Sequence, residues 1–404
     1  MADQTALPVI IIGGGPAGMM AGFLFARAGV RTIVMEKHAD FLRDFRGDTV
    51  HPSTLGIFDE LGLLDALLAR KHDKVASLGA VISGREYRVA DFSRLPGPTP
   101  FVAMMPQWHF LDFVADVARR LPAFTLRMES EAIGLIEGGT RIAGVRLANG
   151  ETLEASLVIA ADGRSSRIRE AAGLPLQDLG APIDVLWFRV PKPRTPDNRT
   201  QAYIDRGEMI VTIDRGDYFQ CARVIEKGAA DRIRAAGIER FRKDVATTAT
   251  SLRPHIGTIA DWSDVKLLAV SLDRLTCWHR PGLLAIGDAA HAMSPVGGVG
   301  INLAIQDAVA AANILTAPLL AHHDPDPLLH QVRARRMFAV HTIQAVQRSI
   351  HRNVIGSAMR NKAPFAPAAV RLLQAVPALQ AIPAWLLGFG IRREHVLPPD
   401  AKRQ

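Results

Sequence analysis

Short apolar runs followed by glycine-rich turns occur in two distant parts of the chain, and they predict buried strands. Residues 9–12 are Val-Ile-Ile-Ile, a β-branched run without a polar side chain, as expected of a strand covered on both faces. Residues 17–28 have helical spacing, and a second apolar run occupies residues 32–35. Residues 283–286 form a similar run, and a helix is predicted to begin near Ile301. This pattern is typical of a parallel sheet covered by helices.

Further elements of both kinds follow the first apolar runs. Three strand-like runs and two helical stretches are predicted at residues 124–128, 143–147 and 153–160 and at residues 52–61 and 107–121. The Gly138-Gly139 turn separates the first two of these strand-like runs, and Asn149-Gly150 separates the last two, as turns in β-hairpins do.

The middle of the chain has a different pattern, in which apolar and polar positions alternate. The alternation covers residues 184–223, and short strands broken by Gly and Pro are predicted at 76–104. Such alternation is typical of half-buried antiparallel strands. Two helices around 228–250 and a strand near 266–272 complete this block. Since the first pattern resumes only afterwards, we interpret the block as a second domain inserted into the first.

The last part of the chain is predicted to be helical. A long helix is expected over residues 328–352, and residues 372–391 contain no charged side chain. That stretch is just long enough to span a bilayer, but two prolines interrupt it. We therefore expect two short helices packed on the body of the protein. A monotopic membrane contact through Trp385 and the basic pair at 392–393 is the less favoured alternative.

Charge and cysteine content narrow the functional classes. With 48 basic and 40 acidic side chains the net charge is +8, which suggests acidic small molecules or an anionic surface as partners. The basic residues are scattered, so no nucleic acid is expected. Cys221 and Cys277 are too few for a disulfide framework or a metal site, and we expect both to be buried thiols. The first apolar run has Asp3 and no cationic residue before it, which favours a cytoplasmic protein over a signal peptide.

A glycine-rich turn connects the first predicted strand to the first predicted helix. Gly13, Gly15 and Gly18 fit the G-x-G-x-x-G pattern, which permits a tight turn and the approach of backbone N–H groups to a pyrophosphate. The positive end of the helix dipole points at the phosphates. Glu36 closes the next apolar run, where a carboxylate accepts hydrogen bonds from an adenosine ribose. The combination predicts dinucleotide binding.

A second glycine cluster follows the apolar run at residues 283–286. Asp288 lies at the predicted strand end, where it can bind a chain of hydroxyl groups. Gly297, Gly298 and Gly300 allow backbone N–H groups to approach a planar ring at the start of the next helix, where developing negative charge would be stabilised. We expect the two clusters to bind opposite ends of one cofactor.

The chain resembles the single-component FAD-dependent aromatic hydroxylases of the para-hydroxybenzoate hydroxylase type. Besides the two glycine clusters, residues 162–169, Asp-Gly-Arg-Ser-Ser-Arg-Ile-Arg, fit the family pattern Asp-Gly-x-x-Ser-x-x-Arg. The resemblance covers residues 5–320, although from 176 to 275 it concerns the architecture only. The chain departs from the family at Val299, where a Gln or Glu is frequent.

The resemblance implies an α/β fold with a Rossmann-like FAD-binding domain, a mixed-sheet substrate domain inserted into it and a helical C-terminal tail. The expected boundaries are residues 1–75, 95–178 and 276–325 for the FAD-binding domain, 76–94 and 179–275 for the substrate domain, and 326–404 for the tail.

The resemblance also assigns cofactor-binding residues. Those at the first glycine cluster are Gly13, Gly15, Pro16, Ala17, Gly18, Glu36 and Lys37. The other implied FAD contacts are Arg46, Gln107, Asp162, Gly163, Gly287, Asp288, Gly300, Ile301 and Asn302. Pro295 and the backbone of Gly298 would lie beside the reactive ring, and Arg169 would help to receive NADH or NADPH.

The reaction implied by the resemblance is a monooxygenation. NADH or NADPH would reduce the FAD, O₂ would add at the flavin C4a position, and the hydroperoxide would transfer oxygen to an aromatic or quinone-like small molecule. The alternative on the same scaffold is a reductase of isoprenoid or lipid-like double bonds. A halogenase is disfavoured because residues 187–191, Trp-Phe-Arg-Val-Pro, lack the second Trp of the halogenase pattern. A monomer or a homodimer is expected.

No acid–base residue is predicted. His51 is expected in a surface loop, and His291 is expected to satisfy backbone groups. Trp187 and Phe188 are assigned to core packing, with a wall of the substrate cavity as the less favoured alternative. Tyr203 and Tyr218 are candidates to hydrogen-bond a substrate hydroxyl.

Overall fold

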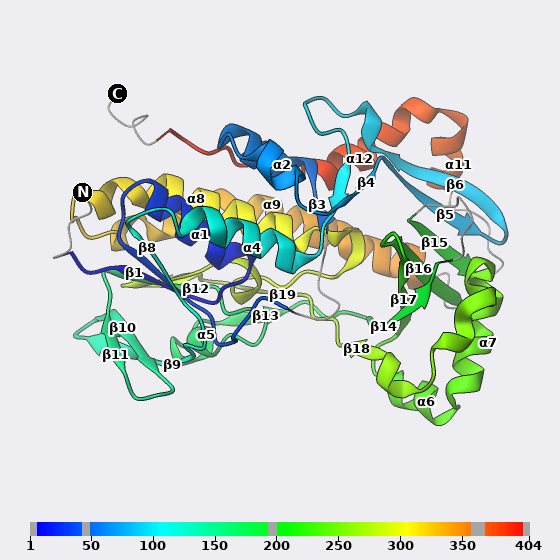
Figure 1. The fold of residues 1–404 in the computed structure, drawn as a ribbon, viewed down its shortest axis with the longest axis horizontal. Helices are drawn as coiled ribbons and strands as arrows, with labels where there is room; N and C mark the ends of the chain where they lie inside the picture. Colours follow the sequence, from blue (N-terminus) through cyan, green and yellow to red (C-terminus); the bar gives the residue numbers. More distant parts are fainter. Residues whose placement is uncertain (1–5, 43–48, 193–199, 357–367, 399–404) are drawn as a thin grey trace.

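The computed structural model describes residues 6–42, 49–192, 200–356 and 368–398, and it contains two large sheets (Figure 1). The first sheet has six strands in the order β20 (His279–Arg280), β21 (Leu283–Ala285), β12 (Leu157–Ala160), β1 (Val9–Ile12), β2 (Thr32–Met35) and β8 (Phe124–Arg127). Its strands are parallel except for β20 at the edge. All residues of β1, β12 and β21 are buried, which explains why these runs are wholly apolar.

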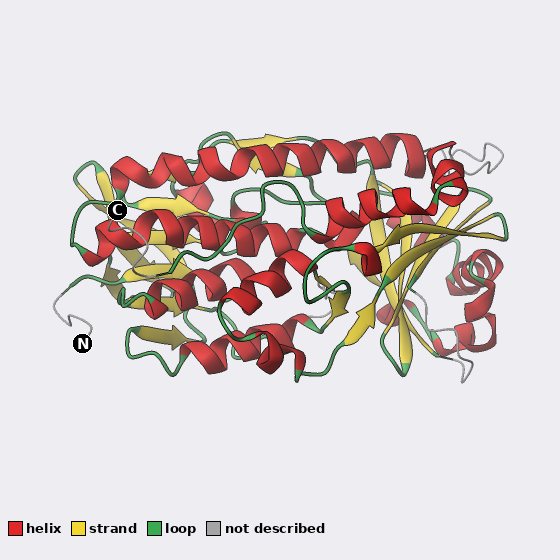
Figure 2. Ribbon diagram, turned by 90° about the horizontal axis from the view of Figure 1, so that it is seen from above, coloured by secondary structure: helices red, strands yellow, loops and turns green. Residues whose placement is uncertain are grey.

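Long helices cover one face of this sheet and run side by side in Figure 2. They are α1 (Pro16–Arg27), α4 (Gln107–Ala118), α8 (Gly300–Leu320) and α9 (Leu329–Ile350). α1 packs against both α4 and α8, and α9 packs on α8. Within the described residues, one helical stretch, Val296–Leu320, is long and apolar enough to cross a membrane, but 67% of its apolar window is buried inside the protein. It is the central helix of the core.

A three-stranded sheet and the short helix α5 (Arg167–Ala171) lie on the opposite side of the six-stranded sheet (Figure 1). Its strands are β11 (Thr152–Glu154), β10 (Arg141–Leu147) and β9 (Ala132–Gly138). β9 was not predicted from the sequence, because Gly134 and Glu137 weaken its strand pattern. The predicted single strand at 153–160 was also wrong. The run divides at Ser156, whose N–H donates to Pro8 O at 3.0 Å, and β12 then enters the other sheet.

The second large sheet has seven strands and lies at the other end of the molecule (Figure 1). Its order is β18 (Lys266–Leu268), β14 (Ile183–Pro191), β17 (Tyr218–Glu226), β16 (Glu208–Asp214), β15 (Gln201–Asp205), β5 (Ser77–Ile82) and β6 (Arg85–Asp91). The sheet is mixed because β15 and β5 are parallel while the other neighbours are antiparallel. α6 (Ala230–Ala235) and α7 (Ile238–Thr248) pack on this sheet and form a hydrophobic core with it, to which Phe241 belongs.

Smaller elements occur between these sheets along the chain. One three-stranded sheet consists of β3 (Thr49–Val50), β7 (Val102–Met104) and β4 (Asp73–Val75), and β13 (Leu176–Asp178) pairs with β19 (Asp273–Leu275). The helices α2 (Pro52–Glu60) and α3 (Leu64–Leu68) follow β3. The residue boundaries expected for the two domains stay a prediction.

The C-terminal helices α11 (Ala368–Ala375) and α12 (Ala381–Gly388) pack on β6, as predicted for this uncharged stretch. α12 has two different faces. Ala384 is fully buried among the side chains near β6, whereas Ile382 and Trp385 are 64% and 48% exposed.

Candidate functional site

Loops that follow four parallel strands meet at one edge of the six-stranded sheet. Gly13 follows β1, Glu36 follows β2, Gly287 follows β21, and Asp162 lies two residues after the end of β12. Since the carboxyl ends of parallel strands share one edge, the structure brings the first glycine cluster, the middle motif and the Gly287–Ala289 turn together. Open α/β sheets bind ligands at this kind of crevice.

The first glycine turn is shaped by two close backbone approaches. A Cβ on Gly13, which has a φ of +108°, would lie 2.3 Å from Ala161 O. A Cβ on Gly18 would lie 1.9 Å from Gly13 O. A Cβ on Gly15 would meet no atom within 4 Å, so free space lies directly at the start of α1. Pro16 and Ala17 form the first turn of α1, whose leading N–H groups have no partner within the helix.

Glu36 points at this turn. Its Oε2 accepts a hydrogen bond from Gly14 N at 3.0 Å, and its Oε1 accepts one from His38 N at 3.0 Å. The side chain is buried, so the carboxylate is held in one orientation, while the neighbouring Lys37 is exposed.

Arg164 joins the middle motif to Asp288. Its Nε lies 2.9 Å from Asp288 Oδ2, and its Nη2 donates to Met293 O at 3.1 Å. Both charged side chains are about one-third exposed, as expected of a pair that borders a crevice. Arg164 Nη1 is buried and has no hydrogen-bond partner among the described residues. This donor therefore remains available to an anionic ligand group.

Arg169 and Asp162 have mainly internal contacts. Burial raises the pKa of Asp162, whose carboxylate accepts hydrogen bonds from Ser166 Oγ at 2.5 Å and Ile168 N at 3.3 Å. Arg169 is buried, and its guanidinium donates to Ala289 O at 3.3 Å and Arg164 O at 2.9 Å. It therefore joins two loops from inside, which does not support the expected direct role in receiving NADH or NADPH. Gly163 has open space at its Cβ position.

The second glycine cluster forms a tight turn between Pro295 and α8. A Cβ on Gly298 would lie 2.4 Å from Thr49 Oγ1, and one on Gly297 would lie 2.8 Å from Leu387 Cδ2. Glycine is thus required here because β3 and α12 approach the turn so closely. The approach of α12 was not predicted from the sequence.

Asn302, in the first turn of α8, fastens this cluster to the loop at β3. Its Oδ1 accepts hydrogen bonds from His51 N at 3.0 Å and Thr54 Oγ1 at 2.7 Å. Its Nδ2 donates to Thr49 O at 3.2 Å and Gly298 O at 3.4 Å. The side chain is therefore engaged within the protein, and a ligand would meet the backbone of Gly300, Ile301 and Asn302 at the helix start.

His51 corrects a sequence prediction, because it is only 2% exposed and does not lie in a surface loop. Its Nδ1 is 2.5 Å from Leu387 O, so α12 covers it. Burial lowers the pKa of His51 to about 4, with the hydrogen bond to Leu387 opposing this shift, and the imidazole is neutral at pH 7. The sequence could not reveal this, because the covering residue lies more than 300 positions away.

A buried charged group lies directly behind the Gly287–Ala289 turn. Asp307 Oδ2 accepts from Gly287 N at 3.0 Å and lies 2.6 Å from His291 Nε2, while its Oδ1 is 2.9 Å from Arg336 Nε. Burial alone would raise the pKa of Asp307, but the charges and hydrogen bonds of His291 and Arg336 hold it below its usual value. The expectation that His291 satisfies backbone groups was therefore wrong.

The structure also shows the surroundings of a predicted cofactor residue, a predicted substrate residue and the two cysteines. Gln107 is the first residue of α4 and is partly buried, and Arg46 lies outside the described residues. Tyr203 OH is 2.9 Å from Ser251 Oγ and thus has a partner within the protein. Cys221 is buried as predicted, whereas Cys277 is only partly buried.

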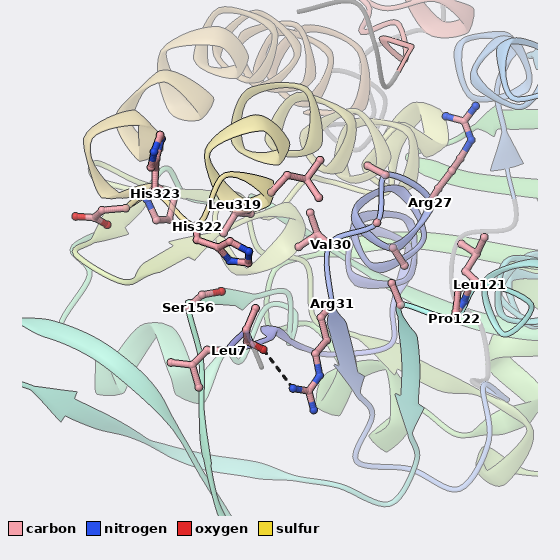
Figure 3. Close-up of a pocket in the computed structure, with 18 of the residues that line it drawn as sticks. Leu7, Arg27, Val30, Arg31, Leu121, Pro122, Ser156, Leu319, His322 and His323 are labelled. Atoms are coloured by element: carbon pink, nitrogen blue, oxygen red, sulfur yellow. Dashed lines mark hydrogen bonds between the residues drawn. The ribbon is translucent and has the colours of Figure 1, made fainter. Parts of the chain in front are cut away.

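A cavity of about 870 Å³ lies at the opposite edge of the six-stranded sheet (Figure 3). Its lining includes Leu7, Arg31 and Ser156, which precede β1, β2 and β12, and His322 beyond α8. Because these residues lie at the amino ends of the strands, the cavity is separate from the crevice formed by the glycine clusters.

These observations agree with a comparison to known proteins. The model of a FAD binding domain family matches residues 6–346. The chain belongs to this family of FAD-dependent monooxygenases. It is 32% identical over 391 residues to the 6-methylpretetramide 4-monooxygenase of Streptomyces rimosus, with 94% of this chain and 92% of that protein covered. It is 27% identical over 307 residues to a rifampicin monooxygenase of Streptomyces venezuelae, with 74% of this chain and 62% of that protein covered.

Solved structures of similar fold confirm the predicted fold class. PqsL, a probable FAD-dependent monooxygenase from Pseudomonas aeruginosa, has a TM-score of 0.76 at 21% identity, covering 88% of this chain and 99% of that chain. A 2-methyl-3-hydroxypyridine-5-carboxylic acid oxygenase has a TM-score of 0.73 at 20% identity, covering 98% of this chain and 100% of that chain.

The residues at the crevice fit FAD. The free space at Gly15 would admit a pyrophosphate at the start of α1, and the unpartnered Arg164 Nη1 could donate to an anionic group. No role at the crevice was predicted for Arg164 or Asp307, and Asn302 was expected to contact FAD directly. Their partners are distant in the sequence, and no local pattern marks them.

Proposed function

We propose that this protein is a monooxygenase that uses FAD, NADH or NADPH, and O₂ to hydroxylate an aromatic or quinone-like small molecule. The observation that carries the proposal is that the first glycine turn, with free space at Gly15, meets the Gly287–Ala289 turn, where a Cβ on Gly287 would lie 2.9 Å from Ala17 Cβ. The second glycine cluster, tightly enclosed around Gly298, follows that turn along the chain. The first suits a pyrophosphate, and the second suits a planar ring that must be kept from water.

When bound, FAD would accept electrons from NADH or NADPH and activate O₂ through its C4a position. The first turn of α1 would bind the pyrophosphate, and Glu36 would accept hydrogen bonds from the adenosine ribose. Asp288, held by Arg164, would bind hydroxyl groups of the ribityl chain. The start of α8 would stabilise negative charge on the ring.

Water exclusion at the ring would depend on α12 and its neighbours. Leu387 packs at Gly297, and its carbonyl lies against His51. Since His51 is buried and neutral, this side of the site contributes no charge that would hold water. Leu387 and His51 are therefore expected to keep one side of the reaction site dry.

The substrate would lie between the second glycine cluster and the seven-stranded sheet. Val296 packs against an apolar cluster on that sheet that includes Val185, Ala222 and Val224. Trp187 packs on the same cluster, and its buried indole N–H has no partner among the described residues, so a substrate carbonyl or hydroxyl would satisfy it. This apolar surface and the similarity to the 6-methylpretetramide 4-monooxygenase support a polycyclic aromatic substrate over a small benzoate.

The test has two steps. The purified protein is first examined for a bound flavin by its visible spectrum, and a colourless folded protein that does not bind added FAD would contradict the proposal. Oxidation of NADH and NADPH and uptake of O₂ are then measured with a panel of polycyclic phenols, quinones and benzoates. One O₂ consumed per reductant, with an oxygenated product, is expected. Turnover that proceeds without O₂ would indicate the reductase instead.

A further inference from the structure

The loop around Pro295 is held from one side by α9. Gln347 is buried, with 3% of its surface exposed. Its Oε1 accepts from Ser294 N at 3.1 Å, and its Nε2 donates to Ser294 O and to Val296 O, both at 2.9 Å. One amide side chain therefore fixes the backbone on both sides of Pro295.

His351 adds a second contact to the same loop. Its Nε2 lies 2.9 Å from Ser294 Oγ, and both side chains are at most 2% exposed. Ser294 Oγ also accepts from Val296 N at 3.3 Å, so the hydroxyl links the imidazole to the backbone beyond Pro295. The other ring nitrogen, Nδ1, is buried and has no hydrogen-bond partner among the described residues.

The helix changes geometry at this point. α9 continues into a π-helical turn, His351–Ile355, and such turns occur often at functional sites. Gln347 and His351 are four residues apart and so lie on one helix face. Ile355 belongs to the apolar cluster on the seven-stranded sheet, against which Val296 and Ile350 also pack. The C-terminal end of α9 and the π-helical turn thus contact both the loop around Pro295 and the proposed substrate surface.

We propose that Gln347 and His351 are positioning residues that set the place of Ser294, Pro295 and Val296 against the flavin ring. The inference rests on the proposed function, since it presumes that this loop borders FAD. Hydrogen bonds and contacts at the ring tune a flavin's electronic properties, and a shift of 1 Å at a reacting centre can lower a rate about 100-fold. Removing these side chains is therefore expected to change the properties of bound FAD more than its affinity.

A first experiment requires no FAD. Hydrogen exchange of the segment 292–298 is measured by mass spectrometry in the full-length protein and in Gln347→Met. Because the acceptor of Ser294 N is lost, exchange there is expected to be at least tenfold faster. Gln331→Met, on an exposed position of the same helix, is the control and should leave this segment unchanged. Unchanged exchange in Gln347→Met would overturn the positioning role of Gln347.

A second experiment uses the FAD-bound protein. The visible spectrum and the midpoint potential of bound FAD are compared among the unmodified protein, Ser294→Ala, His351→Leu, His351→Gln and the exposed control His341→Leu. In His351→Leu we expect a tenfold or larger change in the relative affinity for reduced and oxidised FAD, about 30 mV for a two-electron couple. His351→Gln keeps a polar group near the Nε2 position and should restore much of this change.

The double variant Ser294→Ala, His351→Leu separates a specific contact from general damage. If His351 acts through Ser294, the double variant shifts the potential no more than the larger single shift. Additive shifts, or a potential and spectrum in His351→Leu equal to those of the unmodified protein, would overturn the inference. Should His351→Leu fail to fold, Ser294→Ala, which removes the same hydrogen bond, takes its place, and a potential equal to that of the unmodified protein would overturn the inference. An unmodified protein that binds no FAD contradicts the proposed function instead, and the exchange experiment still tests the contact.

Discussion

Gly15 occupies a position in the first glycine turn at which an added side chain meets no protein atom within 4 Å. Its backbone is extended, with a φ of −75° and a ψ of −178°, which any residue can adopt. Threonine also serves about as well as glycine at the start of a helix. The position therefore allows the space for the pyrophosphate to be filled without disturbing the fold.

We expect Gly15→Thr to weaken FAD binding at least tenfold while the free energy of unfolding of the FAD-free protein changes by less than about 0.5 kcal/mol. Flavin fluorescence titration and urea unfolding measure the two quantities. Gly134→Thr is the matched control, since Gly134 in β9 also has open space at its Cβ position and lies away from the crevice. Equal FAD affinity in Gly15→Thr and the unmodified protein would contradict the assigned pyrophosphate site.

His51 predicts a dependence of stability on pH. An unfolded histidine titrates near pH 6.5, whereas burial lowers the pKa of folded His51 to about 4. Between these values the unfolded chain binds a proton that the folded protein excludes. The contribution of His51 to stability is therefore complete above pH 6.5 and falls as the pH decreases toward 4, in total by on the order of 3 kcal/mol.

The measurement is the free energy of unfolding from urea titrations at pH 7 and pH 5. In His51→Gln, which keeps a donor for Leu387 O, the loss between these two values should be smaller by about 2 kcal/mol than in the unmodified protein. His330→Gln, at an exposed position of α9, should keep the full loss. An equal pH dependence in His51→Gln and the unmodified protein would mean that His51 is not the buried neutral group described here.

At the scale of elements, α8 and α9 hold the strand-end loops through polar side chains. Asp307 on α8 binds Gly287 N and lies between His291 and Arg336, and Arg336 also reaches Glu394 Oε1 at 3.2 Å. Both Asp307 and Arg336 are fully buried. Removing the charge of one partner leaves the other buried without compensation, which is strongly destabilising.

We therefore expect Asp307→Asn to lower the free energy of unfolding by about 3–5 kcal/mol and to weaken FAD binding through the displaced turn at Gly287. Urea unfolding and flavin titration measure both effects. Arg232→Gln removes an exposed ion pair with Glu226 and should cost less than about 1 kcal/mol. If Asp307→Asn lowers the free energy of unfolding no more than Arg232→Gln does, the buried charge of Arg336 does not depend on Asp307 for compensation.

The elements themselves were predictable where local chemistry decides them. The runs of β1 and β2 are short, apolar and followed by glycine or glutamate, so their bounds agree with the prediction. β9 was missed because it is partly exposed and contains Gly134 and Glu137, and β11 was merged with β12 because only two residues, Ala155 and Ser156, separate them. Which sheet a strand joins depends on contacts such as that of Ser156 with Pro8, which no local pattern contains.

The candidate site divides in the same way. Gly13, Gly18 and Glu36 could be assigned from spacing, because the helix and both strands that hold them are consecutive in the sequence. The enclosure of Gly298 by Thr49 and the burial of His51 under Leu387 depend on segments about 250 and more than 300 positions apart. Long-range packing of this kind is decided by the whole fold.

At the scale of the whole molecule, α12 connects the FAD-binding side to the seven-stranded sheet. On its inner face, Ala384 is fully buried against Ala90 and Phe92, and Leu387 contacts the second glycine cluster. Its outer residue Ile382 is 64% exposed. The helix thus has a tightly packed inner face and an unconstrained outer face.

This difference predicts that a leucine lowers stability on the inner face and has little effect on the outer face. Ala384→Leu adds volume to a filled contact and should lower the free energy of unfolding by about 1–3 kcal/mol. Ile382→Leu changes an exposed side chain and should alter it by less than about 0.5 kcal/mol. Thermal or urea unfolding measures both, and comparable values for the two variants would contradict the described seating of α12.

The closure of the ring site by Leu387 also sets an order of events during synthesis on the ribosome. The strands and glycine turn near the start of the chain are made first, but the enclosure of Gly297 and His51 requires α12. A nascent chain that has not yet been extended through Leu387 therefore lacks the segment that covers Gly297 and His51. Under the proposed function, the cover of the flavin ring is thus the last part of the cofactor pocket to be synthesised.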